Sequence, residues 1–258
     1  MSEAVVLYEV QNNVGIITLN RPKSLNAINP QVSQMLMESF RDAAVNPEVR
    51  AIILTGAGKG FCSGEDLNDV NEDTSPAKII KERYMPLILL MRSIEKPIVC
   101  AVNGVAAGAG FSLVLACDIR IASENASFGQ VFVRLGLIPD AGSTYFLPRL
   151  IGQGRALEMM LTGQIIDANE ARSLGLISGI YRREDLLAQS LRLAERLARS
   201  APLAIANTKK LVRITDDNSL EEQMNIEAEI QEELGHTEDF KEGTQAFLEK
   251  RRPVFKGK

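Results

Sequence analysis

Side chains that could act as nucleophiles or metal ligands are sparse in this sequence of 258 residues. The single histidine, His236, stands in the polar stretch Leu-Gly-His-Thr-Glu-Asp, which is typical of a solvated loop. A Ser-His-Asp or Cys-His mechanism would depend on this one residue reaching a nucleophile. The three cysteines, Cys62, Cys100 and Cys117, form no CxxC pair. We therefore expect reduced thiols, a cytoplasmic location and no metal site.

Two segments rich in small residues are better candidates for a site, because each follows a predicted buried strand. They are Phe61-Cys-Ser-Gly-Glu-Asp-Leu67 and Asn103-Gly-Val-Ala-Ala-Gly-Ala-Gly110. Small residues let a substrate approach main-chain N–H groups, and the second segment opens a predicted helix whose first N–H groups lack helical partners. Two such loops could form an oxyanion hole that stabilises an enolate. The preceding Gly56-Ala-Gly-Lys-Gly60 has neither Rossmann nor P-loop spacing and predicts a turn.

One carboxylate stands in a suggestive place, in Leu137-Ile-Pro-Asp-Ala-Gly-Ser-Thr144. Asp140 could be a turn residue after proline that caps the next helix, which is a common role for aspartate. It could equally be a catalytic base, because a positioned carboxylate can accept a proton from carbon. The residues alone leave both interpretations open.

The elements that must position these groups follow from the hydrophobic pattern. It predicts strands over 14–19, 51–55, 97–102 and 119–122, and helices over 30–44 and 108–117. Asn29 is the expected N-cap of the first helix. From residue 155 onward the pattern is mostly helical. We expect an α/β fold with a core over 1–200 and a helical region over 201–258.

Charge and composition exclude several classes of protein. The chain has 33 acidic against 29 basic residues, a net charge of -4, so we expect no nucleic-acid partner and no membrane partner. With 45% hydrophobic and 24% charged residues, the composition is that of a globular protein. The apolar stretch 98–117 contains Asn103, Ser112 and several glycines, which favours a buried strand, turn and helix over a membrane span.

Four longer motifs surround these candidates. They are Asn20-Arg-Pro-x-x-Leu-Asn-Ala27, Thr55-Gly-Ala-Gly-Lys-Gly-Phe-Cys-Ser-Gly-Glu-Asp-Leu67, Lys96-Pro-Ile-Val-Cys-Ala-Val-Asn-Gly-Val-Ala-Ala-Gly-Ala-Gly110 and Cys117-Asp-Ile-Arg-Ile-Ala-Ser123. Together they resemble the crotonase family, the enoyl-CoA hydratase/isomerase superfamily. The similarity continues to Glu242-Gly-x-x-Ala-Phe-Leu-Glu-Lys-Arg251 and covers essentially the whole chain in the family's order.

The resemblance implies a crotonase-type spiral of ββα turns with a C-terminal helical region for trimerisation. It also implies a homotrimer or a dimer of trimers, a coenzyme A thioester as substrate, and no tightly bound cofactor. By position, the amides of Glu65 and Ala109 would hold the thioester oxygen, with Gly108 and Gly110 beside them.

Further positions match the family's CoA-binding segments. Ser63, Asp66 and Leu67 match the stretch against adenine and pantetheine, and Lys23, Ser24 and Leu25 match a second CoA-contacting loop. Phe247 and Lys250 fall where the family closes the CoA site, sometimes from a neighbouring subunit.

The sequence departs from the family's hydratases at their two catalytic glutamates. Ser112 and Phe132 stand at these positions, and neither side chain is a carboxylate base near neutral pH. An aspartate after Gly-Leu-Ile-Pro, as at Asp140, resembles the isomerase branch that includes ring-1,2-epoxyphenylacetyl-CoA isomerases.

We therefore expect an acyl-CoA isomerase in which Asp140 moves a proton along an enolate, shifting a double bond or opening a ring epoxide. Phe132 should exclude water and raise the pKa of Asp140 by desolvation. Three alternatives stay open. A dienoyl-CoA isomerase would pair its aspartate with a glutamate near position 132, and a hydratase would need Glu65 or another carboxylate to turn inward. A catalytically silent acyl-CoA-binding protein would need no base.

Overall fold

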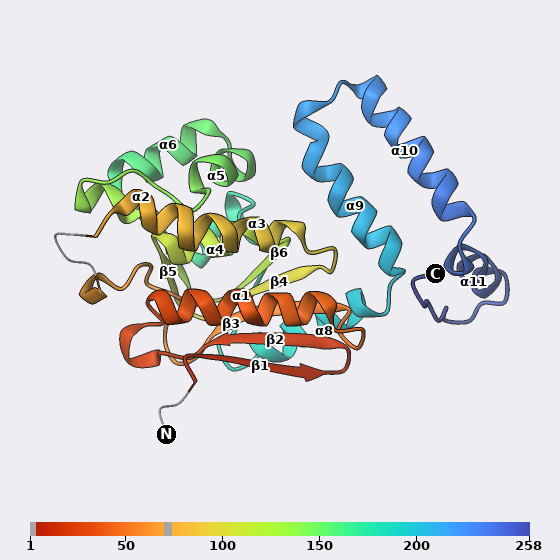
Figure 1. Ribbon diagram of the computed structural model, residues 1–258, viewed down its shortest axis with the longest axis horizontal. Coiled ribbons are helices and arrows are strands. Elements are labelled where there is room, and N and C mark those ends of the chain that lie inside the picture. The colour runs from red at the N-terminus through yellow and green to blue at the C-terminus, as the bar shows by residue number, and fades with distance from the viewer. Residues whose placement is uncertain (1–3, 70–73) are drawn as a thin grey trace.

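A twisted sheet of mainly parallel strands forms the centre of the computed structural model, which describes residues 4–69 and 74–258 (Figure 1). Its order is β1-β2-β3-β4-β6-β9, and only the first pair is antiparallel. The strands are β1 (Val6–Gln11), β2 (Val14–Leu19), β3 (Ala51–Gly56), β4 (Ile98–Val102), β6 (Ile119–Ser123) and β9 (Gly179–Tyr181). A second sheet combines β5 (Val105–Ala107), β7 (Ser127–Gly129) and β8 (Ile165–Asp167).

The same order of secondary-structure elements repeats along the chain. A strand of the large sheet is followed by a short strand or bridge and then by a helix, as in β4, β5 and α4 (Ala109–Ala116). After β2 and β3 the short strand is reduced to single bridges, Ile28 to Glu65 and Cys62 to Ala106. The helices that follow are α1 (Pro30–Val45) and the continuous stretch of α2 (Pro76–Ile79), the π-helical turn η3 (Ile80–Tyr84) and α3 (Met85–Ser93). The expected spiral of ββα turns is confirmed.

Successive side chains along the strands point to opposite faces of the sheet and so belong to two separate hydrophobic layers. On β3, Ile52 and Leu54 pack into the large cluster with Phe40 of α1, whereas Ala51 and Ile53 face the opposite side. The helix α8 (Leu186–Ala198) covers that second face. Because both faces are covered, the central strands are apolar throughout, as the sequence pattern predicts.

The local signals place the early helices correctly. Helix α1 begins at Pro30 because the side chain of Asn29 accepts a hydrogen bond from the Val32 N–H (2.9 Å). The strands expected at 14–19, 51–55, 97–102 and 119–122 are β2, β3, β4 and β6.

Elements that the pattern did not predict include α3, α5 (Ser143–Ile151) and α11 (Glu238–Leu248). The remaining elements are α6 (Gln153–Thr162), α7 (Ala168–Ser173), η1 (Pro22–Ser24), η2 (Leu67–Asp69), η4 (Val131–Leu135) and η5 (Thr215–Asp217).

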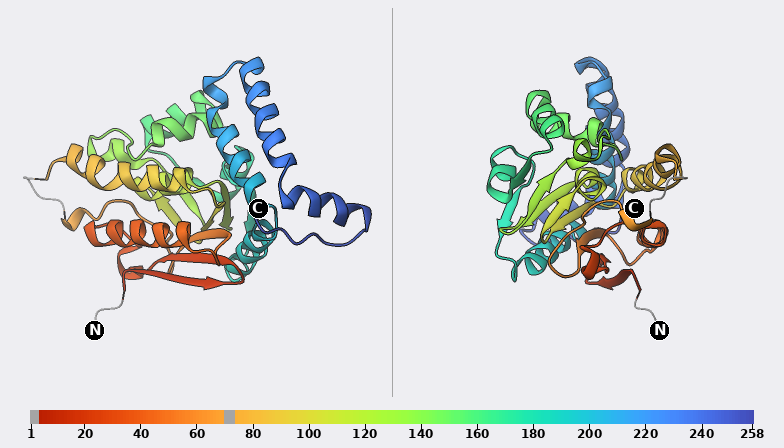
Figure 2. Two further views of the ribbon diagram at one scale, coloured as in Figure 1. Left: turned by 45° about the vertical axis from the view of Figure 1, so that its right-hand side comes forward. Right: turned by 90° about the vertical axis from the view of Figure 1, so that its left-hand side faces the viewer.

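The last helices extend from the core. Helix α9 (Pro202–Ile214) is tied to it by Lys209, whose Nζ lies 2.6 Å from the Asp118 carboxylate. In Figures 1 and 2, α10 (Leu220–Gly235) and α11 lie well away from the sheets. None of the described helices is both long and apolar enough to cross a membrane.

Candidate active site

The two glycine-rich loops lie side by side. The Cys62 N–H donates to the main-chain oxygen of Val105 (3.0 Å), and the Ala107 N–H donates back to the oxygen of Cys62 (3.0 Å). These bonds align the first loop with β5. A Cβ placed on Gly64 would stand 3.5 Å from the main-chain nitrogen of Ala109. The loop after β3 therefore runs directly against the N-terminus of α4.

Two main-chain N–H groups, those of Glu65 and Ala109, are free at this junction. Each follows a glycine with a positive φ, +104° at Gly64 and +51° at Gly108, a region that side-chain-bearing residues rarely adopt. Within residues 4–69 and 74–258, neither N–H donates a hydrogen bond. The Ala109 N–H also belongs to the first turn of α4, where helical N–H groups lack partners and carry partial positive charge. The pair can therefore stabilise an oxygen that becomes negative.

Asp140 stands in the turn that precedes α5. Its Oδ1 is buried and, within the described part of the chain, has no hydrogen-bond partner. Burial, and secondarily the charge of Glu65, raises the pKa of Asp140 from 3.8 to about 6. A carboxylate that is desolvated and unpaired is poised to accept a proton near neutral pH.

A buried polar chain fixes the turn that carries Asp140. The Gln130 amide donates to the Ser143 hydroxyl (2.8 Å), which shares a 2.6 Å hydrogen bond with Ser112. The Ser112 hydroxyl reaches the main-chain oxygen of Asp140 at 3.2 Å, and the Ser143 N–H donates to the same oxygen (3.0 Å). The serine that replaces a family glutamate thus holds the main chain of the candidate base. The sequence pattern gave no sign of this chain.

Phe132 lies against the glycine turn. Its side chain is 8% exposed, and its ring Cζ would be 3.7 Å from a Cβ on Gly108. The ring lines the junction with apolar surface, as the sequence predicts. Among the described residues, no group of three or more His, Cys, Asp or Glu side chains is arranged to hold a metal ion.

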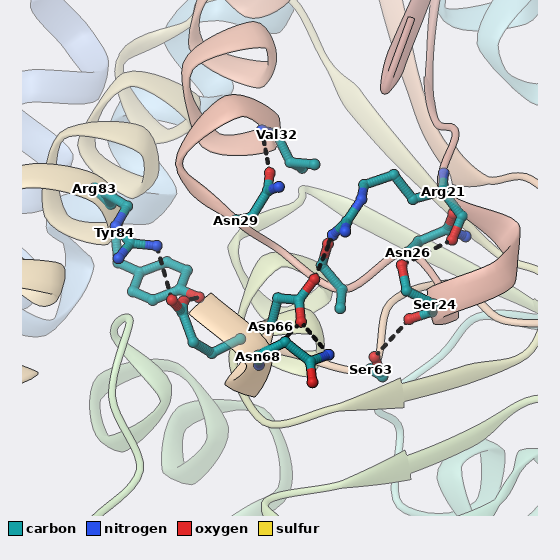
Figure 3. Close-up of polar contacts among 12 residues, drawn as sticks. Arg21, Ser24, Asn26, Asn29, Val32, Ser63, Asp66, Asn68, Arg83 and Tyr84 are labelled. Atoms are coloured by element: carbon teal, nitrogen blue, oxygen red, sulfur yellow. Dashed lines mark hydrogen bonds and ion pairs between the residues drawn. The ribbon is translucent and has the colours of Figure 1, made fainter. Parts of the chain in front are cut away.

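The carboxylate of Glu65 points to the helical stretch above it. Arg83 Nη1 lies 2.7 Å from Glu65 Oε1, and the Tyr84 hydroxyl donates to Oε2 (Figure 3). Burial, and then the Glu65 charge, raises the pKa of Tyr84, so the phenol stays a donor. These contacts anchor the residue whose N–H is free, and they involve side chains that the sequence analysis had not singled out.

The residues expected to contact coenzyme A form a second cluster. The Ser63 N–H donates to the main-chain oxygen of Leu25 (3.0 Å), and its hydroxyl donates to the oxygen of Ser24 (3.3 Å; Figure 3). Lys23 and Leu67 are exposed beside them. The structure thus brings five of the six predicted positions to one surface, with exposed or half-exposed side chains.

Asp66, the sixth position, is engaged within the protein. Its carboxylate lies 2.8 Å from Arg21 Nη1 and accepts from the Asn68 side chain (3.0 Å), and the residue is only 5% exposed (Figure 3). The Arg21 guanidinium holds the pKa of this carboxyl below its usual range. No sequence pattern predicted this ion pair, although Arg21 belongs to the motif Asn20–Ala27.

Three sequence candidates lie elsewhere. Phe247, in α11, is 82% exposed, and Lys250 follows it with a φ of +56°. Figures 1 and 2 place α11 far from α4 and α5, so one chain alone does not bring these residues to Asp140. Their role in closing the CoA site stays a prediction that needs a neighbouring subunit. His236 caps α10 on the surface, where its ring contacts Glu232 (2.9 Å).

Comparison with known proteins gives a consistent result. Residues 9–258 match the family described as Enoyl-CoA hydratase/isomerase. The chain is 42% identical over 100% of both chains to "Probable enoyl-CoA hydratase" of Rhodobacter capsulatus, and 40% identical over 98% of both to 1,2-epoxyphenylacetyl-CoA isomerase of Escherichia coli. The crystal structure of enoyl-CoA hydratase from Bacillus anthracis superposes with a TM-score of 0.93 at 34% identity, covering 98% of this chain and 100% of that one. The chain therefore belongs to the enoyl-CoA hydratase/isomerase family.

Proposed function

We propose that this enzyme isomerises coenzyme A thioesters, moving a double bond or opening a ring epoxide, with Asp140 as its single base. The observation that carries the proposal is the Asp140 carboxyl, whose buried Oδ1 has no partner among the described residues and whose pKa is raised to about 6, in a site that also offers two N–H groups without a partner in the described ranges. Similarity to an isomerase of ring-epoxide thioesters supports it.

The proposed reaction divides into two proton transfers. The N–H groups of Glu65 and Ala109 bind the thioester oxygen of a 3-enoyl substrate, which makes the protons on C2 acidic. The Asp140 carboxylate removes one C2 proton, and the electron pair delocalises over the thioester oxygen, C2 and C4. The protonated Asp140 then delivers that proton to C4, which leaves the 2-enoyl thioester and regenerates the base. The reaction neither consumes nor releases water.

The arrangement gives less support to hydration. Adding water across a double bond uses a second group to position that water, and Ser112 and Phe132 replace the two glutamates of the family's hydratases. Glu65 is a second carboxylate near Asp140, but Arg83 and Tyr84 already bind both of its oxygens. A hydratase remains the second candidate because a similar protein carries that name.

Separate detection of the two reactions tests the proposal. We expect 3-hexenoyl-CoA to be converted to 2-hexenoyl-CoA, with absorbance reporting the conjugated thioester and mass spectrometry reporting any added water. A panel with 2-enoyl, dienoyl and ring-epoxide phenylacetyl thioesters would define the preferred class. Hydration of crotonyl-CoA without double-bond movement would reject the isomerase, and tight binding without turnover of any thioester would identify a silent binding protein.

Assembly through the C-terminal helices is also part of the proposal. Large apolar side chains stand exposed there, among them Leu220, Phe240, Phe247 and Leu248. Several large apolar side chains exposed on one region of a single chain favour an interface there. We expect a trimer or a dimer of trimers, which light scattering after size-exclusion chromatography would distinguish from a monomer.

A further inference from the structure

An apolar pocket continues from the turn that carries Asp140. Its volume is about 480 Å³, and Ala141 and Gly142, the two residues after Asp140, form part of its wall. Ile80 of η3 and Phe146 of α5 add apolar surface. Because the reacting carbons must lie near Asp140, the part of the acyl group beyond them is the segment of substrate that can extend into this pocket.

Arg92, at the end of α3, brings a cation to the wall of this mainly apolar pocket. Its side chain makes no hydrogen bond and no ion pair with any residue in the described ranges, and its Cζ lies 5.4 Å from the centroid of the Phe146 ring. Burial, and then repulsion from Arg213, lowers the pKa of Arg92. Arg92 is half-exposed, and its guanidinium keeps its donors available for an acceptor that a ligand supplies.

Among the described residues, positively charged side chains outnumber carboxylates around Arg92. Arg213, which also lines the pocket, donates from Nη2 to Asp118 (3.1 Å), and Lys209 Nζ lies 2.6 Å from the same carboxylate. Among the described residues, the Asp118 carboxylate is therefore shared by two cations, and Arg92, which also feels the charges of Asp118 and Arg120, adds a further positive charge nearby. Helix α9 thus contributes Arg213 to the pocket wall and Lys209 to the same Asp118 carboxylate, which leaves an excess of positive charge beside the pocket among the described residues.

We propose that Arg92 binds a carboxylate at the distal end of the acyl group, so that the preferred substrates are monothioesters of dicarboxylic acids. This inference rests on the proposed function, because it assumes that the thioester lies at Glu65 and Ala109. The apolar wall accommodates the methylene chain, and the guanidinium, which can form two parallel hydrogen bonds, recognises the terminal carboxylate. The substrate then neutralises the excess charge.

A matched pair of thioesters tests the proposal. The mono-CoA ester of 3-hexenedioic acid and 3-hexenoyl-CoA have the same chain length and differ in the terminal carboxylate. We expect the wild type to have the higher kcat/KM for the diacid ester. Arg92→Gln should lower that value by roughly 10- to 100-fold, the usual effect of losing a charged hydrogen bond, and change the value for 3-hexenoyl-CoA by less than about twofold. Arg92→Lys should retain part of the preference.

Arg149→Gln is the matched control. Arg149 also lies over an aromatic ring of α5, 3.8 Å from the centroid of Tyr145, but it is exposed and pairs with Asp216. This variant should alter neither substrate. Inhibition by free coenzyme A should be the same for Arg92→Gln and the wild type, because a loss there would assign Arg92 to the phosphates of coenzyme A and overturn the proposal.

Binding separates this proposal from the proposed function. Calorimetry with the saturated hexanedioyl and hexanoyl thioesters requires no turnover. If neither unsaturated ester reacts but the wild type binds the saturated diacid ester more tightly, isomerisation fails and the assignment of Arg92 stands. Equal affinity of the wild type for the two saturated esters overturns the assignment, even if Arg92→Gln does not fold.

Discussion

Replacing Asp140 by asparagine is expected to abolish turnover and, at the same time, to make the folded protein more stable at neutral pH. The loss of activity follows from the loss of the base, and general base catalysis contributes about 10²- to 10⁴-fold to a rate. The gain in stability follows from burial. The carboxyl has a buried oxygen without a partner among the described residues, so ionising it in the folded protein is unfavourable.

The size of the gain follows from the pKa of Asp140. Burial raises it from 3.8 in the unfolded chain to about 6 in the folded protein. At about 1.4 kcal/mol per unit, the ionised carboxylate destabilises the fold by at most about 3 kcal/mol, and solvent screening of a partly exposed group reduces this to about 1–2 kcal/mol. The penalty is absent below pH 3.8, where both states are protonated, and it is complete once the pH has risen above 6.

Urea unfolding at fixed protein concentration measures this effect. At pH 8 we expect Asp140→Asn to have a free energy of unfolding about 1–2 kcal/mol above the wild type, and at pH 5 about half of that gain. Asp217→Asn is the control, because Asp217 is an exposed carboxylate in η5 and should show no such gain. A lower stability of Asp140→Asn than of the wild type at pH 8 would refute this reasoning, as would a gain in unfolding free energy that is the same at both pH values, because then ionisation of Asp140 does not destabilise the folded protein.

Three further outcomes are expected. The kcat/KM should rise with pH around a midpoint near 6, where Asp140 ionises. Glu65→Gln should lower that midpoint because it removes the negative charge that helps to raise the pKa of Asp140, and an unchanged midpoint would contradict this charge interaction. Gly110→Ala should abolish thioester binding, measured by calorimetry, because its Cβ would stand 2.3 Å from a main-chain oxygen of the facing loop; normal affinity would show that the loops are not tightly packed. Asp66→Asn should lower the free energy of unfolding at pH 7 by about 1–3 kcal/mol, because the partly exposed Arg21 loses a charged partner at 2.8 Å while it still donates to the main-chain oxygen of Ala27. This loss should shrink in denaturation experiments as the pH falls through the lowered pKa of Asp66, and a variant as stable as the wild type would exclude the ion pair as a stabilising contact.

Local sequence signals were sufficient to predict the strands that lead into the two glycine-rich loops and the first helix. The apolar runs of β3 and β4 and the capped start of α1 depend on residues close together in the chain, so their limits could be predicted to within about a residue. The small residues of the two loops also indicated where a substrate could approach main-chain N–H groups, but the positive φ of Gly64 and Gly108 is known only from the structure. Resemblance to a family supplied the pairing of the two loops, which the spacing alone left open.

Other features exist only because distant segments meet. The strands β5, β7 and β8 have three residues each, too few to show a period, and they form by pairing with one another. The contacts of Glu65 with Arg83 and Tyr84 join a loop to a helix that the pattern did not predict. Short segments and single side chains carry no periodic signal, so sequence patterns could not find them.

The residue types at the site were readable from the sequence, which showed Asp140 in its turn and no glutamate at positions 112 and 132. Tertiary structure decided the chemical state of that aspartate, because the apolar surroundings and the charge of Glu65 that raise its pKa come from other parts of the chain. It also placed Arg92 in the wall of the same pocket as Ala141 and Gly142, the residues that follow Asp140. Desolvation and charge interactions depend on distances through space, and only the folded chain fixes those distances.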